Sequence, residues 1–298
     1  MIGSVIGDVV GSIYEFRNIK TKEFPFFDKR MEYTDDSVLT FATAQWLLDG
    51  GEPANYYYRF GSENECPMGG YGGRFQSWLI RSARGIAAPY GSCGNGSAMR
   101  VGPVGWAFDT AEQTLAAAER SAACTHNHPE GIKGAQATAL AIFMARKGVG
   151  KDEIRRAMEE QFGYDLSLTV DEIRPRYSWD GLDGNLDASG ATCQGSVPQA
   201  LVCALEAVDF EDAIRNAISI GGDSDTVGCI AGSVAEALYG VPGWMRDHVM
   251  TLLSADFKRI IAEFEQLYGA GWADGENARQ GGFVQQIRRF FGFTPKNS

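Results

Sequence analysis

Paired cysteines, a basic leader and long apolar runs are all missing from this sequence, and each absence excludes a class of protein. The six cysteines are scattered and form no CxxC pair, which argues against a disulfide framework or a zinc site and favours reduced thiols. No basic residue precedes Arg17, and Asp8 interrupts the first apolar run, so the N-terminus lacks the pattern of a signal peptide. No apolar stretch approaches the roughly 18 residues of a membrane helix. We therefore expect a soluble, cytoplasmic protein without a membrane partner.

Positive charge is also scarce. Acidic side chains outnumber basic ones by 38 to 27, which gives a net charge of −11 and a pI near 4.8. Such a surface repels phosphates at long range, so we expect no nucleic-acid partner. A small local anion pocket stays compatible with this charge. The hydrophobic content of 44% is that of an ordinary globular protein.

Most of the chain has the apolar periodicity of α-helices. In residues 1–16, Gly3, Gly7, Gly11 and Ser12 recur at about helical spacing. A strand is the alternative for so short an apolar run, but small residues on one face favour a helix that another helix approaches closely. We expect further helices at residues 37–48, 75–84, 111–124, 131–147, 151–162, 197–207, 210–220, 227–240 and, for the most part, 244–268. In the helix at 197–207, Pro198 is expected in the first turn, where proline is tolerated.

The segments between these helices are predicted to be loops. Residues 17–33 form a loop where a lid would be found, 50–74 are turn-rich, and 163–195 form a long loop with room for a short hairpin. About ten helices without alternating strands predict an all-α fold. With no low-complexity linker and no solenoid repeat, we expect residues 1–298 to form a single domain. The tail from about residue 270 is expected to be peripheral, with an amphipathic stretch at 285–291.

Two acidic clusters precede apolar helical runs. They are Thr34-Asp35-Asp36-Ser37 and Gly221-Gly222-Asp223-Ser224-Asp225-Thr226. Helix capping explains one acid per helix, at about 0.3–1 kcal/mol each, but not adjacent acids whose charges repel one another. Carboxylate and hydroxyl oxygens suit Mg²⁺ or Mn²⁺, and six oxygens suit a pair of ions about 3.5–4 Å apart. We favour a metal site, which requires Asp223 and Asp225 to meet Asp35 and Asp36.

Five sequence blocks together resemble the ADP-ribosylglycohydrolase family, which includes dinitrogenase-reductase-activating glycohydrolases and ADP-ribosylarginine hydrolases. The blocks are Gly7-Asp8 with Gly11-Ser12-Ile13-Tyr14-Glu15-Phe16, Thr34 to Ser37, Gly94-Asn95-Gly96-Ser97-Ala98-Met99-Arg100, Thr125-His126, and Gly221 to Gly228. Each block alone is weak evidence. The set stands in the family's order and at its usual spacings, and is specific.

This resemblance implies a compact, orthogonal multi-helix domain with a dinuclear Mg²⁺ or Mn²⁺ site in a cleft. By block match, the metal ligands are Thr34, Asp35, Asp36, Asp223, Asp225 and Thr226. Glu15 matches a glutamate on a mobile segment that acts as a base or captures a metal, although a solvated acid beside a loop is the plain alternative. With Glu15, the acids Asp35, Asp36 and Asp225 are expected to carry the catalysis.

The resemblance also implies an ADP-ribose site. Gly91 to Ser97 would present backbone N–H groups to the diphosphate, a set that includes Ser92, Cys93, Gly94, Asn95 and Gly96. His126 would lie near the phosphate or ribose, although on its own it reads as a helix-cap residue. Tyr71 and Tyr90 are candidates to stack on the adenine.

The implied activity is hydrolysis of the N-glycosidic bond of ADP-ribosylarginine in a modified protein. One alternative is hydrolysis of O-linked ADP-ribose, as in a serine linkage, an acetyl ester or a polymer. Another is a protein that binds or blocks an ADP-ribosyltransferase partner, because relatives of this family include structural proteins. A complete set of six ligands argues against a purely structural role.

Overall fold

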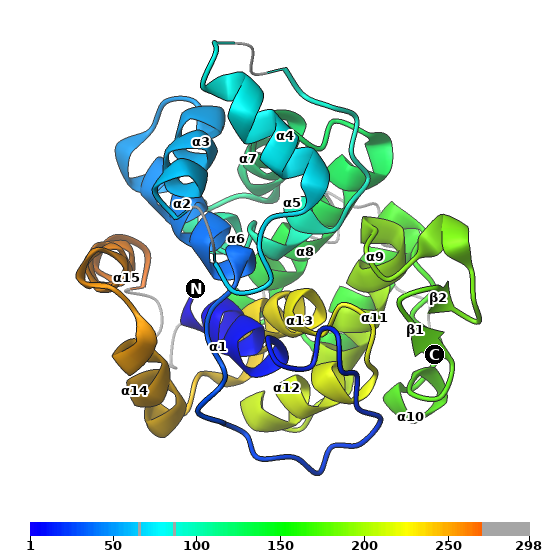
Figure 1. The fold of residues 1–298 in the computed structure, drawn as a ribbon. Coiled ribbons are helices and arrows are strands. Elements are labelled where there is room, and N and C mark those ends of the chain that lie inside the picture. Colours follow the sequence, from blue (N-terminus) through cyan, green and yellow to red (C-terminus); the bar gives the residue numbers. More distant parts are fainter. Residues whose placement is uncertain (65–66, 86–87, 270–298) are drawn as a thin grey trace.

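The chain is described by a computed structural model that covers residues 1–64, 67–85 and 88–269. Helices make up nearly all of its regular structure (Figure 1), which confirms the predicted all-α fold. The elements are α1 (Ile2–Gly11), α2 (Asp35–Asp49), α3 (Pro53–Glu63), α4 (Gly73–Ser82), α5 (Gly96–Met99), α6 (Val104–Ala107), α7 (Ala111–Ala123), α8 (Pro129–Arg146), α9 (Lys151–Phe162), α10 (Val170–Ile173), β1 (Tyr177–Ser178), β2 (Gly181–Leu182), the 3₁₀ turn η1 (Leu186–Ala188), α11 (Cys193–Glu206), α12 (Phe210–Ser219), α13 (Ser224–Tyr239), α14 (Gly243–Leu252) and α15 (Ala255–Tyr268).

Helices α1 and α13, from opposite ends of the sequence, pack side by side in the middle of the fold (Figure 1). Their contact is made by glycines: a β-carbon at Gly7 would overlap the carbonyl of Gly228, and one at Gly3 would overlap the carbonyl of Gly232. The absence of side chains at these positions lets the two backbones touch. The close approach predicted for the glycine face of residues 1–16 is therefore confirmed.

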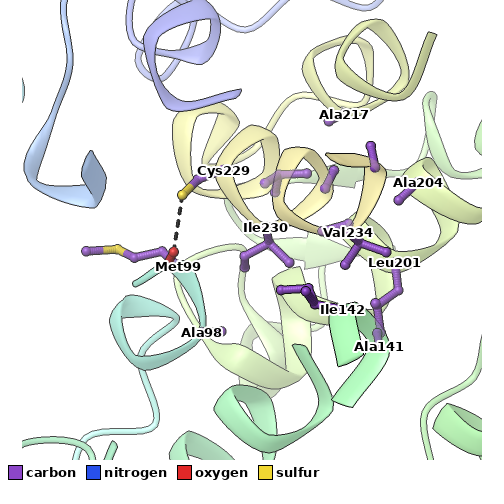
Figure 2. Close-up of a cluster of buried hydrophobic side chains, with 14 of the residues drawn as sticks. Ala98, Met99, Ala141, Ile142, Leu201, Ala204, Ala217, Cys229, Ile230 and Val234 are labelled. Carbon is purple, nitrogen blue, oxygen red and sulfur yellow. Dashed lines mark hydrogen bonds between the residues drawn. The ribbon is translucent and has the colours of Figure 1, made fainter. Parts of the chain in front are cut away.

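The core surrounds α13. Every residue from Ser224 to Glu236 is buried, as expected for a helix with neighbours on all sides. Figure 2 shows Ile230 and Val234 of α13 facing Ile142 of α8 and Leu201 of α11, within one hydrophobic cluster. On another side, the thiol of Cys229 donates to the carbonyl of Met99, with a sulfur–oxygen distance of 3.2 Å. This environment fixes α13, and with it the acidic cluster at its N-terminus.

Several expected helices are present at or near their predicted bounds, most closely at residues 111–123 and 151–162. The helix expected at 37–48 is α2, which begins two residues earlier, at Asp35; Thr34 is its N-cap, and the Thr34 hydroxyl accepts from the amide of Asp36. The short hairpin within residues 163–195 is also confirmed, since Tyr177–Ser178 pairs antiparallel with Gly181–Leu182. The region expected to be helical at 244–268 is two helices, separated at Leu253 and Ser254.

Three predictions about helix positions were wrong. Residues 170–173, assigned to a long loop, form the short helix α10, which Thr169 caps. Residues 53–63, assigned to a turn-rich segment, form α3, which begins with a proline at its first position and buries Tyr57 and Phe60. Helix α11 begins at Cys193 rather than Val197, because the Thr192 hydroxyl caps the amide of Gly195. Pro198 consequently lies inside the helix, where it removes one backbone hydrogen bond.

The description of residues 17–33 as a loop without helix or strand is confirmed. The stretch at 285–291 and the tail from 270 lie outside the described residues, and the single-domain organisation stays a prediction. Within the described part of the chain, no helix combines the length and hydropathy needed to cross a membrane.

We predict that Gly7→Ala and Gly228→Ala destabilise the protein by about 2 kcal/mol or more, because each methyl group meets backbone atoms of the partner helix. Chemical denaturation measures the loss. Gly243→Ala is the matched control, since nothing lies within 4 Å of a β-carbon there. Equal stability of all three variants would contradict the packing argument.

Candidate metal centre and adjoining cavity

A cavity of about 450 Å³ opens where the N-termini of α2 and α13 meet the turn after α1. It contains the two acidic clusters and Glu15 at its wall, together with residues from the segments at 69–75 and 90–100. Most of the predicted site residues line it: Glu15, Asp35, Asp36, Tyr71, Tyr90, Ser92, Gly94, Asn95, Gly96, His126, Asp223, Asp225 and Thr226. The requirement that Asp223 and Asp225 share a site with Asp35 and Asp36 is met.

Asp8 organises the first cluster from beneath. Its carboxylate accepts hydrogen bonds from the amide and hydroxyl of Thr34, at 3.0 and 2.7 Å, and from the amide and hydroxyl of Ser37. Burial nevertheless raises the pKa of Asp8 to about 6, despite these bonds that favour its ionised form. The carboxylate therefore fixes the start of α2 and directs Asp35 and Asp36 to the cavity.

Thr34 lies behind the cavity wall. It is fully buried, and its hydroxyl donates to Asp8 while it accepts from the Asp36 amide at 3.2 Å. It is not among the lining residues. Its predicted role as a direct ligand stays a prediction, and its observed role is to connect Asp8 to Asp36.

Asp36 has an oxygen without a partner. Its Oδ1 atom is buried and makes no hydrogen bond within the described structure. Burial, followed by the charges of Asp225 and Asp8, raises its pKa well above the usual value. The pKa of Asp35 is raised in the same way by burial and by Asp225. Neither carboxyl therefore has a positive partner that would stabilise its ionised form.

The second cluster is held by polar contacts from distant segments. The side-chain amide of Asn95 donates to Asp223 at 2.7 Å, and the Thr226 amide donates to Asp225 at 3.0 Å. Burial raises the pKa of Asp223 to about 6, while a hydrogen bond from Asp225 lowers it in part. The pKa of Asp225 lies well above its usual value because of burial and the charge of Asp223.

Gly222 needs to be a glycine for two reasons. Its φ of +72° is in the left-handed region, and a β-carbon there would meet the ring of Tyr177. The tyrosine therefore packs directly beneath the turn that leads into Asp223. This explains the glycine that precedes the acidic cluster.

Glu15 completes the tightest group of acids. Ligand oxygens of Glu15, Asp223 and Asp225 all lie within 4.8 Å of one another, a spacing that could hold a metal ion. Burial and the charges of Asp225 and Asp8 raise the pKa of Glu15 to about 8. Glu15 was expected near the metals, and it meets the second cluster most closely.

The backbone of Glu15 is held on two sides by residues that the sequence analysis did not identify. Asn18 exchanges hydrogen bonds with the amide and carbonyl of Gly222, both at 2.8 Å, and donates to the Glu15 carbonyl at 3.0 Å. The indole of Trp179 donates to the same carbonyl at 3.0 Å. In this structure the segment is fastened to the turn that carries Asp223.

The charge balance of the cavity favours a cation. No ion pair of the described residues involves Asp8, Glu15, Asp35, Asp36, Asp223 or Asp225. Buried carboxylates without a positive partner repel one another and retain protons. Carboxylate oxygens, including the unpartnered Oδ1 of Asp36, are ligands that Mg²⁺ and Mn²⁺ prefer. The residues present therefore fit a divalent metal centre.

The predicted anion-binding loop is only partly available for a ligand. The amide of Gly91 donates to Asn127 at 2.7 Å, and the amide of Asn95 donates to the Ala191 carbonyl at 3.1 Å. Neither Gly91 nor Cys93 is among the lining residues. In this structure the side chain of Asn127 occupies the Gly91 N–H, and the binding of a ligand by Gly91 stays a prediction. Asn95 contributes its side chain to Asp223 instead.

Aromatic and basic side chains also line the cavity. The guanidinium of Arg74 lies 5.2 Å from the centre of the Tyr90 ring, and Tyr90 lies 5.7 Å from His126. The Tyr71 hydroxyl donates to the Asn64 carbonyl at 2.8 Å. At another part of the wall, Phe16 stacks on Trp179 with centroids 6.1 Å apart. Stacking of adenine on Tyr71 or Tyr90 stays a prediction.

The residues that the sequence analysis missed carry weak local signals. Asp8 could have been identified as a charged residue inside an apolar helix that is otherwise fully buried. Asn18 and Trp179 stand outside helices, in segments without a recognisable pattern, and bond to residues distant in sequence. Arg74 is the second residue of α4, a helix predicted to begin one residue later. Only the folded chain identifies them.

Comparisons with known proteins identify the family of the chain. The family model described as ADP-ribosylglycohydrolase matches residues 1–274. Human ADP-ribosylhydrolase ARH3 is 29% identical over 307 residues, covering 81% of this chain and 84% of the relative. ADP-ribosylarginine hydrolase Tri1 of Pseudomonas putida (strain GB-1) is 28% identical over 272 residues, covering 82% and 70%. A solved structure, an ADP-ribosylglycohydrolase-related protein complex, has the same fold, with a TM-score of 0.65 and 23% sequence identity. The match covers 91% of this chain and 95% of that one.

Because the family model matches nearly the whole chain, the chain belongs to the ADP-ribosylglycohydrolase family.

Proposed function

We propose that this chain is a divalent-cation-dependent hydrolase that releases ADP-ribose from modified arginine side chains of protein. The observation that carries the proposal is the group of buried and half-buried carboxylates that line the cavity, none of them paired with a basic side chain among the described residues. Family membership supports ADP-ribose as the substrate group. One relative is an ADP-ribosylarginine hydrolase, and an acid-rich cavity suits a cationic guanidinium.

The proposed cofactor is a pair of Mg²⁺ or Mn²⁺ ions. Asp35, Asp36, Asp223 and Asp225 would hold them, with the hydroxyls of Thr34 and Thr226 as the remaining ligands. When bound, such ions would orient the ribose 2′- and 3′-hydroxyls and make a water molecule more acidic.

The chemical step proposed for the chain's own residues centres on Glu15. Its carboxylate accepts a proton from the attacking water, whose oxygen forms a bond to the anomeric carbon as the bond to the guanidine nitrogen breaks. The guanidine nitrogen takes up the proton that Glu15 has removed from the water, so the guanidine leaves in protonated form and the Glu15 carboxylate is restored. Nearby carboxylates stabilise the positive charge that develops on the sugar. The hydrogen bonds from Asn18 and Trp179 to the Glu15 backbone keep this base close to the ribose.

A metal-ligand test uses Asp36→Asn and Asp223→Asn. Each variant is expected to lose at least about a hundredfold in kcat/KM, because even residues that only orient metal ligands are worth about 10- to 100-fold. Asp109→Asn is the control, since that side chain is 94% exposed. EDTA should abolish hydrolysis, and Mg²⁺ or Mn²⁺ should restore it. Full activity of either site variant, or indifference to EDTA, would sink the metal assignment.

The linkage is tested by incubating the protein with arginine-, serine- and acetyl-linked ADP-ribose in parallel. We expect the largest kcat/KM for the arginine linkage, because its leaving group is a cation facing an acidic cavity. Faster release from the serine or acetyl linkage would replace the proposed substrate with an O-linked one. Release from none of them would favour a protein that binds or blocks an ADP-ribosyltransferase.

The stability of the metal-free protein should fall as the pH rises. The pKa of Asp8 and of Asp223 is raised from 3.8 to about 6, and that of Glu15 from 4.5 to about 8. The folded state therefore retains protons that the unfolded state loses, and stability declines between about pH 4 and pH 8.

Thermal unfolding in EDTA checks this prediction between pH 5 and pH 8. A divalent cation should reverse the decline, by about 2.7 kcal/mol at a concentration 100 times its Kd, and should stabilise more at pH 8 than at pH 6 because fewer protons then compete. A Tm in EDTA that rises steadily over this interval, or that is unaffected by Mg²⁺ at every pH, would contradict the charge balance described above.

A further inference from the structure

Three polar side chains form a hydrogen-bonded chain that ends at the cavity. The guanidinium Nη2 of Arg100 lies 2.8 Å from the Thr125 hydroxyl, and this hydroxyl lies 2.8 Å from Nδ1 of His126. Arg100 is fully buried, Thr125 is fully buried, and His126 is 6% exposed. Arg100 and His126 both belong to the cavity wall.

Hydrogen-bond chemistry sets the direction of this chain. Arginine has only donors, so the Thr125 oxygen accepts from Arg100. The threonine hydroxyl has a single proton, and the nitrogen of His126 lies within its reach. Burial, followed by the charges of Arg100 and Arg74, lowers the pKa of His126 well below its usual value, so the ring is neutral and has a single N–H. If Nδ1 accepts from Thr125, that N–H must be on Nε2.

The Nε2 atom faces the glycine-containing turn. A β-carbon at Gly96 would lie 3.1 Å from Nε2, and one at Gly94 would lie 3.6 Å from it. Because these positions are glycines, neither of them has a side chain that would cover the nitrogen. An N–H on Nε2 can therefore reach a ligand oxygen bound beside this turn.

Arg100 also has a structural role. Any test must separate this role from that of the hydrogen-bonded chain Arg100–Thr125–His126, which we call the relay. It donates to the Ser121 carbonyl at 2.7 Å and lies 3.8 Å from the centre of the Tyr57 ring. Its Nε and Nη1 atoms have no partner in the described structure. Removing Arg100 would disturb the end of α7 as well as Thr125. Thr125 is the better residue to change.

We propose that Arg100 and Thr125 are positioning residues that hold His126 as the Nε2–H tautomer, so that its ring donates to an acceptor oxygen of the ligand at the Gly94–Gly96 turn. The identity of that ligand as ADP-ribose rests on the proposed function. The tautomer itself depends only on the hydrogen-bonded chain and is testable without any ligand.

The first measurement is made on the wild-type protein, and a variant is needed only to assign the signals. Nitrogen-15 NMR of the metal-free protein, labelled at histidine, reports which ring nitrogen carries the proton. The chain has only three histidines, and the signals of His126 are identified by their loss in His126→Gln. We expect a protonated Nε2 and an unprotonated Nδ1. A proton on Nδ1 would overturn the proposal.

The second measurement compares Thr125→Val with Thr125→Ser. Valine keeps the shape but removes the hydroxyl, so the His126 tautomer should become mixed and the Kd for ADP-ribose, in Mg²⁺, should rise about tenfold, roughly the value of one hydrogen bond. Serine should preserve both the tautomer and the affinity. A valine variant that folds with the wild-type tautomer and affinity would overturn the relay.

These results are distinguishable from failure of the proposed function. A wild-type Nε2–H tautomer that becomes mixed in Thr125→Val supports the relay even when no ADP-ribosylated substrate is turned over, and that outcome contradicts only the proposed function. Hydrolysis of ADP-ribosylarginine by a protein whose His126 carries its proton on Nδ1 contradicts only the relay.

Discussion

The contact on which the site depends is the glycine-to-glycine packing of α1 against α13. Asp8 and Glu15 follow from the position of α1, and Asp223 and Asp225 from the start of α13, so the distance between these helices sets the distance between acids. Gly7 and Gly228 allow the backbones to touch. A larger residue on either helix would separate the carboxylates that the cavity brings together. Helix packing thereby becomes a determinant of ligand geometry.

The packing of α1 against α13 brings several carboxyl groups together in a buried site. Burial is the largest cause of the raised pKa of each acid at the centre, and neighbouring carboxylates add to it at Glu15, Asp35, Asp36 and Asp225. Hydrogen bonds to Asp8 and Asp223 lower their pKa in part, and so offset some of the free-energy cost of burying their charged forms. The rest of the fold must supply the missing free energy until a cation binds. The buried apolar residues around α13 supply it (Figure 2).

Local patterns in the sequence predicted a large part of this arrangement, and long-range contacts account for what they missed. The cluster from Thr34 to Ser37 was placed at the start of a helix, and the glycines of residues 1–16 predicted a close helix contact, because both signals lie within a few residues. Nothing local indicates that Gly7 meets Gly228, that Asn18 bonds to Gly222 across 204 positions, or that Trp179 bonds to Glu15 across 164. The true start of α11 was missed because Cys193 and Gly195 are weak helix formers, although Thr192 caps it.

The cavity wall thus presents two chemically opposite groups, each supported from behind. Asp8, Asn95 and Asn18 hold carboxylates or their backbone, and these carboxylates offer acceptor oxygens. Arg100 and Thr125 stand behind His126, beside the turn that includes Gly96. Acceptor oxygens suit cations and the hydroxyls they hold, and the proposed donor nitrogen of His126 suits an anion. A ligand that joins a vicinal diol to a diphosphate would match both groups, which a simple metal store or a phosphate site would not require.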